Sequence, residues 1–218
     1  MNKKQVTIML LFGMLLLGTV FSGQTEELTE RTMKIQLPTF SLLEENEAFN
    51  TINKTLYSES FSLLTTNSVD VETDFSHWDV TDYYSQATKT FENQRMISFK
   101  MDQYLYTYRS AHGSHLYLGF VFDLETGKKL RLNELFTVSE TFLSVINGFM
   151  LETVKEKDIP IFEFTDFKGL DDSAEFYLQD ESLIIVFQEY AYTPYVYGPL
   201  VFNIPFSEIT DFSSSKYF

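Results

Sequence analysis

The sequence contains no cysteine, which excludes disulfide bonds, thiolate zinc sites and cysteine nucleophiles. Positive charge is also scarce: 16 Lys and Arg residues stand against 31 Asp and Glu residues, for a formal net charge of -15. Contacts with a phosphate backbone need clustered positive charge, so a nucleic-acid partner is not expected. Glycine is infrequent, at nine residues, and no glycine-rich phosphate loop occurs.

Apolar and aromatic residues are abundant by contrast. Of the 218 residues, 44% are hydrophobic and 17% are aromatic, which is enough to bury a sizeable core. This composition excludes an intrinsically disordered chain, a collagen-like fibre and a multi-pass membrane protein. The length fits one large domain or two small, intertwined ones.

The N-terminus has the pattern of a secretory signal peptide. A short basic segment precedes an apolar run at 6–21, and small and polar residues follow. We expect cleavage after Ser22, which makes 1–22 the signal peptide and 23–32 a flexible lead. An uncleaved membrane anchor is the alternative, because the run falls just below the ~17–25 residues that span a bilayer. A cysteine-free exported chain fits secretion from, or the surface of, a Gram-positive bacterium, since small exported animal domains usually carry disulfides.

Beyond the lead, the pattern predicts an α+β fold made of two small halves, each a helix packed on an antiparallel sheet. We place the N-terminal half at 33–136 and the C-terminal half at 137–218. No linker rich in proline, glycine or serine separates them, which favours a shared interface.

The predicted elements follow from hydrophobic periodicity and capping residues. The N-terminal half is expected to contain an edge strand or a strand end at 34–37, a helix at 46–64 capped by Asn46, and strands at 84–92, 96–108 and 116–124. The C-terminal half is expected to begin with a helix that is capped by Ser139 and ends before Pro160. A hairpin and a last strand follow, at 175–178, 183–187 and 200–204.

The residue types that carry catalysis or bind metals do not form a recognised site in the sequence. Two of the three histidines, His112 and His115, flank a glycine-serine pair that breaks helical geometry, so they do not form a helical zinc motif. Ser110 and Ser114 lie near His112, but adjacency in sequence is not a catalytic triad. The alternating acids at 70–74 lack the glycine and the bidentate glutamate of a calcium loop. We therefore expect no catalytic residues, no metal and no cofactor.

The densest unusual feature is an aromatic stretch at 187–206 that contains three prolines. One interpretation is strand core followed by a rigid turn. The other is a proline-stiffened loop that presents tyrosines, which give large contact area at low entropic cost and often anchor interfaces. On the second interpretation, the expected partner-binding residues are Tyr190, Tyr192, Pro194, Tyr195 and Tyr197.

Four segments form an ordered pattern along the chain. They are the motif Ser110, Ala111, His112 and Gly113, the run at 122–136 that begins Phe-Asp-Leu-Glu-Thr-Gly-Lys, the aromatic segment at 190–198, and Ile-Pro-Phe-Ser-Glu at 204–208. Together they resemble a bacterial extracytoplasmic domain pair of unknown function. That family includes the outer region of the RsiV anti-sigma factor, which binds lysozyme, and the accessory region of PdaC-like peptidoglycan deacetylases. The chain departs from the family pattern at Ser110, where a glycine is usual.

The resemblance implies an exported, non-catalytic binding or sensing module of the bacterial envelope, with a lysozyme-like cationic protein as the expected partner. The acidic net charge agrees, because it would steer a basic partner towards the chain. Peptidoglycan is the alternative ligand, since aromatic faces stack on sugars. A hydrolase that uses Ser110 or Ser114 with His112 is the third hypothesis. Membrane contact is expected only through an uncleaved N-terminal segment.

Overall fold

The computed structural model describes residues 32–37, 46–67 and 80–218. The predicted signal peptide and nearly all of the predicted lead lie outside the described residues. Within the three described ranges, no helix combines the length and the apolar character needed to cross a membrane.

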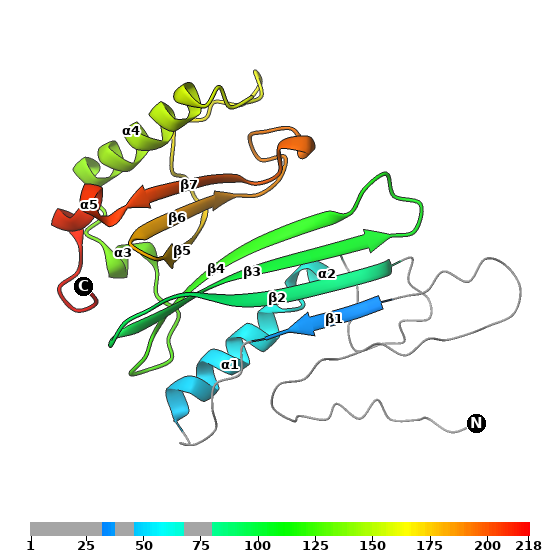
Figure 1. The fold of residues 1–218 in the computed structure, drawn as a ribbon, viewed down its shortest axis with the longest axis horizontal. Coiled ribbons are helices and arrows are strands. Elements are labelled where there is room, and N and C mark those ends of the chain that lie inside the picture. The colour runs from blue at the N-terminus through cyan, green and yellow to red at the C-terminus, as the bar shows by residue number, and fades with distance from the viewer. Residues whose placement is uncertain (1–31, 38–45, 68–79) are drawn as a thin grey trace, which may run out of the picture.

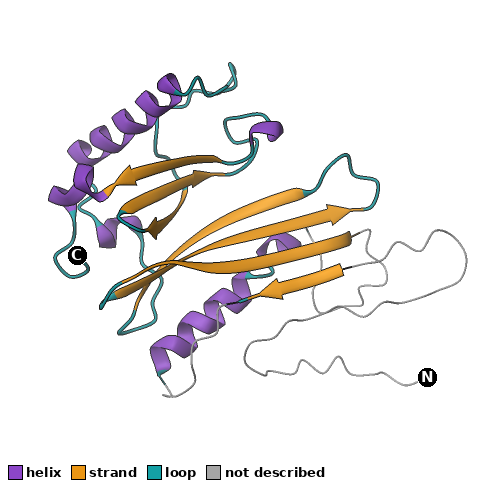
Figure 2. Ribbon diagram, in the orientation of Figure 1, coloured by secondary structure: helices purple, strands orange, loops and turns teal. Residues whose placement is uncertain are grey.

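Two sheets, each with a long helix on its far side, lie against each other, so the prediction of an α+β fold is confirmed (Figure 1, Figure 2). The larger sheet has four strands in the order β1 (Thr32–Gln36), β2 (Val80–Glu92), β3 (Met96–Thr107) and β4 (Ser114–Asp123). The smaller sheet has three, β5 (Glu175–Gln179), β6 (Ser182–Phe187) and β7 (Leu200–Pro205). The long helices are α1 (Glu47–Glu59) and α4 (Glu140–Glu156), and the short ones are α2 (Ser62–Thr66), α3 (Leu132–Leu135) and α5 (Phe206–Ile209).

One pairing in the larger sheet differs from the prediction of wholly antiparallel sheets. Strand β1 is an edge strand, as predicted, but it runs parallel to β2, with Ile35 opposite Ser85. The pairings of β2 with β3 and of β3 with β4 are antiparallel. A helix lies between β1 and β2 in the chain, and a crossover of this kind returns the chain to the same end of the sheet, so the next strand runs parallel.

Helix α1 covers one face of the larger sheet because its apolar residues recur at helical spacing. Ile52 and Leu56 are buried in one cluster with Phe99 and Phe120 of the sheet. The predicted cap is confirmed, since the Asn46 side chain accepts a hydrogen bond from the backbone N–H of Ala48 at 2.9 Å. The prediction of one continuous helix at 46–64 is wrong, because α1 ends at Glu59 and α2 begins at Ser62.

The break between α1 and α2 lies at Ser60, which is completely buried. The Tyr83 hydroxyl of β2 donates a hydrogen bond to the Ser60 carbonyl at 2.5 Å, and the Ser60 hydroxyl donates to the Tyr57 carbonyl at 2.7 Å. Burial raises the pKa of the Tyr83 hydroxyl well above its usual range, so it remains a donor. Side-chain and tertiary hydrogen bonds thus replace the regular helical pattern at this point.

Helix α4 provides the core of the second half. Phe142, Ile146 and Met150 are fully buried at a spacing of four residues, in one cluster with residues of β5, β6 and β7. The helix ends at Glu156, before Pro160, as predicted. The predicted cap is confirmed as well, because the Ser139 side chain accepts a hydrogen bond from the backbone N–H of Phe142 at 3.2 Å.

Replacing Ser139 with alanine should lower the free energy of unfolding by about 1 kcal/mol. The side chain satisfies one of the N–H groups that a helix leaves unpaired at its start, and alanine removes that acceptor. Urea unfolding followed by circular dichroism measures the change. Ser139→Asp keeps an acceptor and should recover the lost stability, whereas an alanine variant as stable as the parent would contradict the role of the cap.

The second half covers only part of the outer face of the larger sheet, meaning the face opposite α1 and α2. At one end of this face, Met96 and Val121 belong to the core cluster of the second half. Opposite Val121 in the register, the Ser98 hydroxyl accepts a hydrogen bond from the N–H of Leu178 at 2.9 Å and donates to the carbonyl of Phe120 at 3.0 Å. The other end of the outer face carries the residues described next.

Candidate functional site

The turn between β3 and β4 meets the loop between β6 and β7, and these segments carry both sets of predicted residues. The ring of His112 in the turn stacks on the ring of Tyr195 in the loop, with 3.9 Å between centroids and 22° between planes. Tyr190 stacks on Tyr195 at 5.6 Å and 26°. His112, Tyr190 and Tyr195 are referred to below as the aromatic cluster.

Hydrogen bonds fix the orientation of the His112 ring. Its Nδ1 lies 2.8 Å from the carbonyl oxygen of Gly113, and its Nε2 lies 3.3 Å from the Tyr190 hydroxyl. Because a carbonyl only accepts, Nδ1 donates to it. The Tyr195 hydroxyl donates to the same Gly113 carbonyl at 3.2 Å. One carbonyl in the turn therefore holds two members of the cluster.

Two features of the backbone keep the cluster in place. Gly113 is buried, and a Cβ atom there would lie 2.0 Å from Cε2 of Tyr104, so a larger residue would require the Tyr104 ring to move. Arg109 in the turn and Tyr190 in the loop have positive φ angles of 67° and 64°, which residues with side chains seldom adopt. Strained residues of this kind concentrate at functional sites; here Tyr190 belongs to the cluster, and Arg109 lies three residues before His112.

The remaining predicted residues, apart from Tyr192, lie at or near the surface beside the cluster. Ser110 and Ala111 are exposed in the turn. Pro194 precedes a short 3₁₀ turn, and Tyr197 at the end of that turn is 43% exposed. Val196, which the sequence analysis did not select, is 94% exposed and is the most prominent apolar side chain of the loop.

Tyr192 points inwards. Its ring packs edge-on against Phe167 and Phe187, with centroids 4.8 and 5.2 Å away. Its hydroxyl donates to the carboxylate of Asp171, and this hydrogen bond, together with burial, raises the pKa of Tyr192 to about 12. Each interpretation of the aromatic stretch therefore describes part of it, because Tyr192 extends the core while the neighbouring tyrosines reach the surface.

The contacts of His112 also bear on the hydrolase hypothesis. Its ring nitrogens meet the Gly113 carbonyl and the Tyr190 hydroxyl, and in the described ranges neither Ser110 nor Ser114 forms a hydrogen bond with the ring. Serine nucleophiles are activated through such a bond. Across the described part of the chain, no group of three or more His, Asp or Glu side chains is placed to hold a metal ion. The arrangement offers stacking surfaces and hydroxyl groups, which suit binding.

Rings on the outer face of the larger sheet extend the cluster, and the sequence analysis did not select them. The strand register places Tyr84 opposite Tyr104 and Tyr104 opposite His115, so three rings lie abreast. The rings of His115 and Tyr117 are stacked at 5.9 Å with 3° between their planes. Tyr84, Tyr104, His115 and Tyr117 are referred to below as the tyrosine face. Strand alternation in the sequence assigns neighbouring members to one face, but it does not say which face stays open.

Gln188 attaches the loop to the tyrosine face. Its side-chain oxygen accepts from the N–H of Tyr117 at 2.9 Å, and its side-chain amide donates to the carbonyl of Tyr117 at 2.6 Å. The next residue, Glu189, accepts from the Tyr117 hydroxyl at 3.5 Å. Burial, and then the carboxylates of Glu189 and Asp102, raise the pKa of Tyr117 to about 12, so this hydroxyl is a donor at neutral pH.

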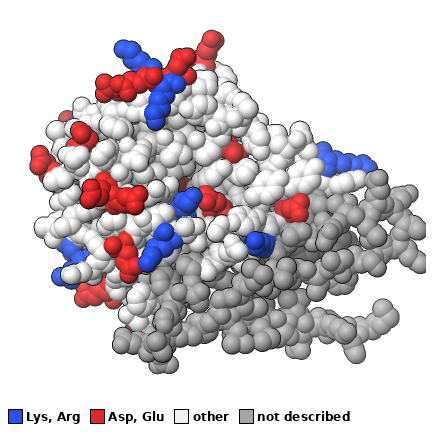
Figure 3. Space-filling model, viewed as in Figure 1, with Lys and Arg blue, Asp and Glu red and all other residues white. Residues whose placement is uncertain are grey.

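Charged side chains of both signs lie over the surface seen in Figure 3, with broad uncharged areas between them. The formal net charge of -15 is therefore not gathered into a single acidic patch on this side of the molecule.

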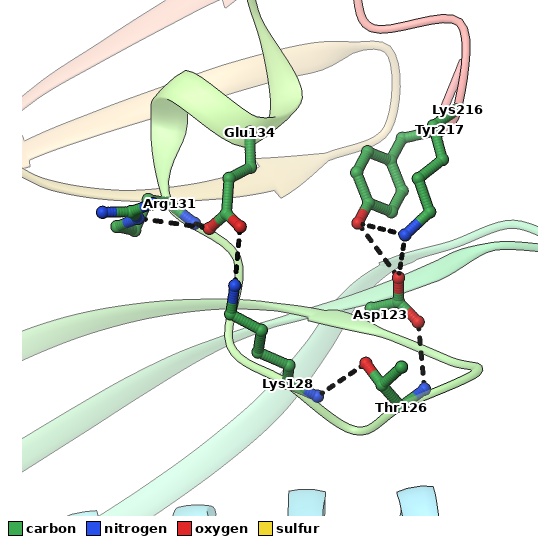
Figure 4. A network of polar contacts seen from close by, with 7 residues as sticks. All are labelled: Asp123, Thr126, Lys128, Arg131, Glu134, Lys216 and Tyr217. Carbon is green, nitrogen blue, oxygen red and sulfur yellow. Dashed lines mark hydrogen bonds and ion pairs between the residues drawn. The ribbon is translucent and has the colours of Figure 1, made fainter.

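A polar network at the opposite end of β4 fastens the C-terminal tail (Figure 4). Asp123 accepts hydrogen bonds from Lys216 at 2.8 Å and from the Tyr217 hydroxyl at 3.0 Å. Nearby, Glu134 of α3 pairs with Lys128 at 2.7 Å and with Arg131 at 3.3 Å. A pocket of about 230 Å³ is lined in part by Asp123, Lys216 and Tyr217. These polar groups are bonded to one another, so we assign the network a structural role and take the aromatic cluster as the candidate site.

The comparisons with known proteins concern mainly the second half of the chain. Residues 133–207 match the model of a family described as "Protein of unknown function (DUF3298)". The DUF3298 match includes the loop with Tyr190 and Tyr195 but not the turn with His112. The predicted resemblance to a bacterial domain of unknown function is confirmed for this segment. No curated protein matches the chain.

Two solved structures of DUF3298 proteins share the fold. A DUF3298 family protein from Pseudomonas aeruginosa aligns with a TM-score of 0.62 at 15% sequence identity, over 94% of each chain. A member of the family from Bacteroides fragilis aligns with a TM-score of 0.52, also at 15% identity, over 85% of this chain and 86% of its own. At this level of identity, the likeness establishes the fold alone.

Proposed function

We propose that this protein is an exported, non-catalytic binding module of the bacterial cell envelope, and that its aromatic cluster holds a cationic protein of the lysozyme kind. The observation that carries the proposal is the meeting of two distant segments, with His112 stacked on Tyr195 at 3.9 Å. Both segments belong to the pattern that resembles the RsiV outer region. Their convergence at the surface supports a shared role in binding.

The physical chemistry of the cluster favours binding. Partly exposed tyrosines contribute large contact areas with few rotatable bonds, and their hydroxyls supply directional hydrogen bonds. The formal net charge of -15 would speed the encounter with a basic partner, most strongly at low salt. Charge would thus govern the rate of association, while the rings would govern how long the complex lasts.

Replacing Tyr195 with alanine should weaken lysozyme binding about tenfold or more. The ring of Tyr195 stacks on His112, and its hydroxyl donates to Gly113, so its removal takes away the centre of the cluster. Fluorescence anisotropy of labelled lysozyme, titrated with the full chain at low salt, measures the affinity.

The matched control is Tyr57→Ala. Tyr57 is 40% exposed on α1, on the far side of the larger sheet, and its loss should leave lysozyme binding unchanged. If the parent chain does not bind lysozyme at low salt, the proposed partner is wrong. If Tyr195→Ala binds as tightly as the parent, the proposed site is wrong.

Peptidoglycan is a second candidate ligand, and the rings that lie abreast on the tyrosine face favour it. Capture of the chain by purified peptidoglycan free of teichoic acid distinguishes the two ligands. Retention on peptidoglycan by a chain that does not bind lysozyme in the anisotropy titration would support the glycan and argue against the cationic protein.

A further inference from the structure

We infer that the tyrosine face, bordered by Glu189, is a docking surface for lysine and arginine side chains of a protein partner. The inference rests on the proposed function and extends it, because it places the charge-specific contacts on the sheet as well as on the loop. Three observations carry it: the face is open, carboxylates surround its rings, and one cation already lies over it.

The openness of the tyrosine face follows from the packing around it. Helices α1 and α2 cover the opposite face of the larger sheet. The second half covers the outer face near Gly119, where a Cβ atom would lie 1.8 Å from the carbonyl oxygen of Phe176. The four rings of the face are partly exposed and belong to none of the core clusters in the described residues. The backbone at Gly113 packs on the ring of Tyr104, and the part of the four rings that stays exposed is available to a partner.

Carboxylates surround these rings. Asp102 lies directly opposite Tyr117 in the register and is paired with Lys100 at 3.3 Å. Glu189 and Asp82 form no ion pair with any lysine or arginine in the described ranges. Asp82 also influences one of the rings: burial, and then the charge of the Asp82 carboxylate, raise the pKa of the Tyr104 hydroxyl. Within the described ranges, the face thus combines neutral tyrosine rings with carboxylates that have no lysine or arginine partner.

This combination selects a cation. An ammonium or guanidinium group over a tyrosine ring gains about 0.5–2 kcal/mol, and an adjacent carboxylate adds a charge-assisted hydrogen bond. A neutral sugar would gain from the rings but would leave the charge of Glu189 unpaired. The molecule shows the geometry itself, since Nζ of Lys34 lies 5.9 Å from the centroid of the Tyr84 ring. A basic protein surface therefore matches this face better than a neutral glycan does.

The test uses the full chain and a fluorescein-labelled peptide of eight lysines, with the fully acetylated peptide as its uncharged counterpart. Glu189→Gln should weaken binding of the lysine peptide about fivefold and reduce its dependence on salt. The matched control is Glu152→Gln, which makes the same charge change on an exposed position of α4 and should leave binding unchanged. The acetylated peptide should bind weakly to all three proteins.

The outcomes separate the inference from the proposed function. Equal effects of Glu189→Gln and Glu152→Gln, or equal binding of both peptides, would overturn the inference whether or not lysozyme binds. Lysozyme binding that is lost in Tyr195→Ala but kept in Glu189→Gln would leave the proposed function in place and remove the sheet face from it. Binding of the lysine peptide that depends on Glu189, without binding of lysozyme, would support the surface and reject the proposed partner.

Discussion

Gly119→Ala should lower the free energy of unfolding by about 3 kcal/mol or more. Gly119 lies where β5 crosses β4, and a Cβ atom there would lie 1.8 Å from the carbonyl oxygen of Phe176 and 2.4 Å from its carbonyl carbon. Both are backbone atoms, so the clash is relieved only if the two sheets separate. Separation would also lengthen the hydrogen bond from the Gly119 N–H to Glu175, which measures 3.2 Å. Urea unfolding followed by circular dichroism measures the loss.

Gly148→Ala is the matched control for this substitution. Gly148 lies inside α4, and a Cβ atom there would meet no atom within 4 Å. Alanine is preferred to glycine in a helix interior by about 1 kcal/mol, so this variant should be more stable than the parent. Glycine to alanine should therefore lower the free energy of unfolding at position 119 and raise it at position 148. A Gly119→Ala variant with the urea midpoint of the parent would show that β4 and β5 do not pack as described.

The strands and the long helices could be predicted because each leaves a local pattern in the sequence. Burial alternates along β3 from Phe99 to Leu105, and Phe142, Ile146 and Met150 recur every four residues, as strand and helix geometry require. The caps at Asn46 and Ser139 could also be predicted, since a side-chain acceptor before an apolar helix has a local physical reason.

Features that depend on distant contacts could not be predicted. The break at Ser60 depends on the hydroxyl of Tyr83, which is 23 residues further along the chain. The direction of β1 depends on how the chain crosses the sheet after it, and a five-residue strand carries no local sign of that. Gly119 looks like an ordinary glycine inside a strand until the position of β5 is known.

Some features of the candidate site could likewise be predicted from local sequence, while others depend on distant contacts. The sequence marks the turn and the loop as separate candidates, but His112 and Tyr190 are 78 residues apart, and nothing local indicates that they meet. Tyr192 and Tyr190 are the same residue type two positions apart, yet one contacts Phe187 and the other reaches the surface. The left-handed backbone at Tyr190 turns the chain between them, and a tyrosine gives no warning of that conformation.

The carboxylate of Asp123 should make the fold less stable in acid. Its side chain is only 4% exposed, and burial alone would raise its pKa. Hydrogen bonds from Lys216, from Tyr217 and from the backbone N–H groups of Thr126 and Glu125 outweigh burial and lower the pKa to about 2, from an ordinary value of 3.8. A carboxylate whose pKa is lowered by folding contributes stability above its unfolded pKa and loses it as the pH falls through its folded pKa.

The loss attributable to Asp123 should amount to about 2 kcal/mol between about pH 4 and about pH 2. Urea unfolding of the parent and of Asp123→Asn across this range measures it, and the variant should show a flatter dependence on pH. Glu152→Gln is the control, because it removes a carboxylate at an exposed position of α4 and leaves the Asp123 network intact. In the control variant, the free energy of unfolding should still fall between about pH 4 and about pH 2, because Asp123 is unchanged. Equal slopes for the parent and Asp123→Asn would mean that the tail contacts of Lys216 and Tyr217 do not hold this carboxylate in its charged form.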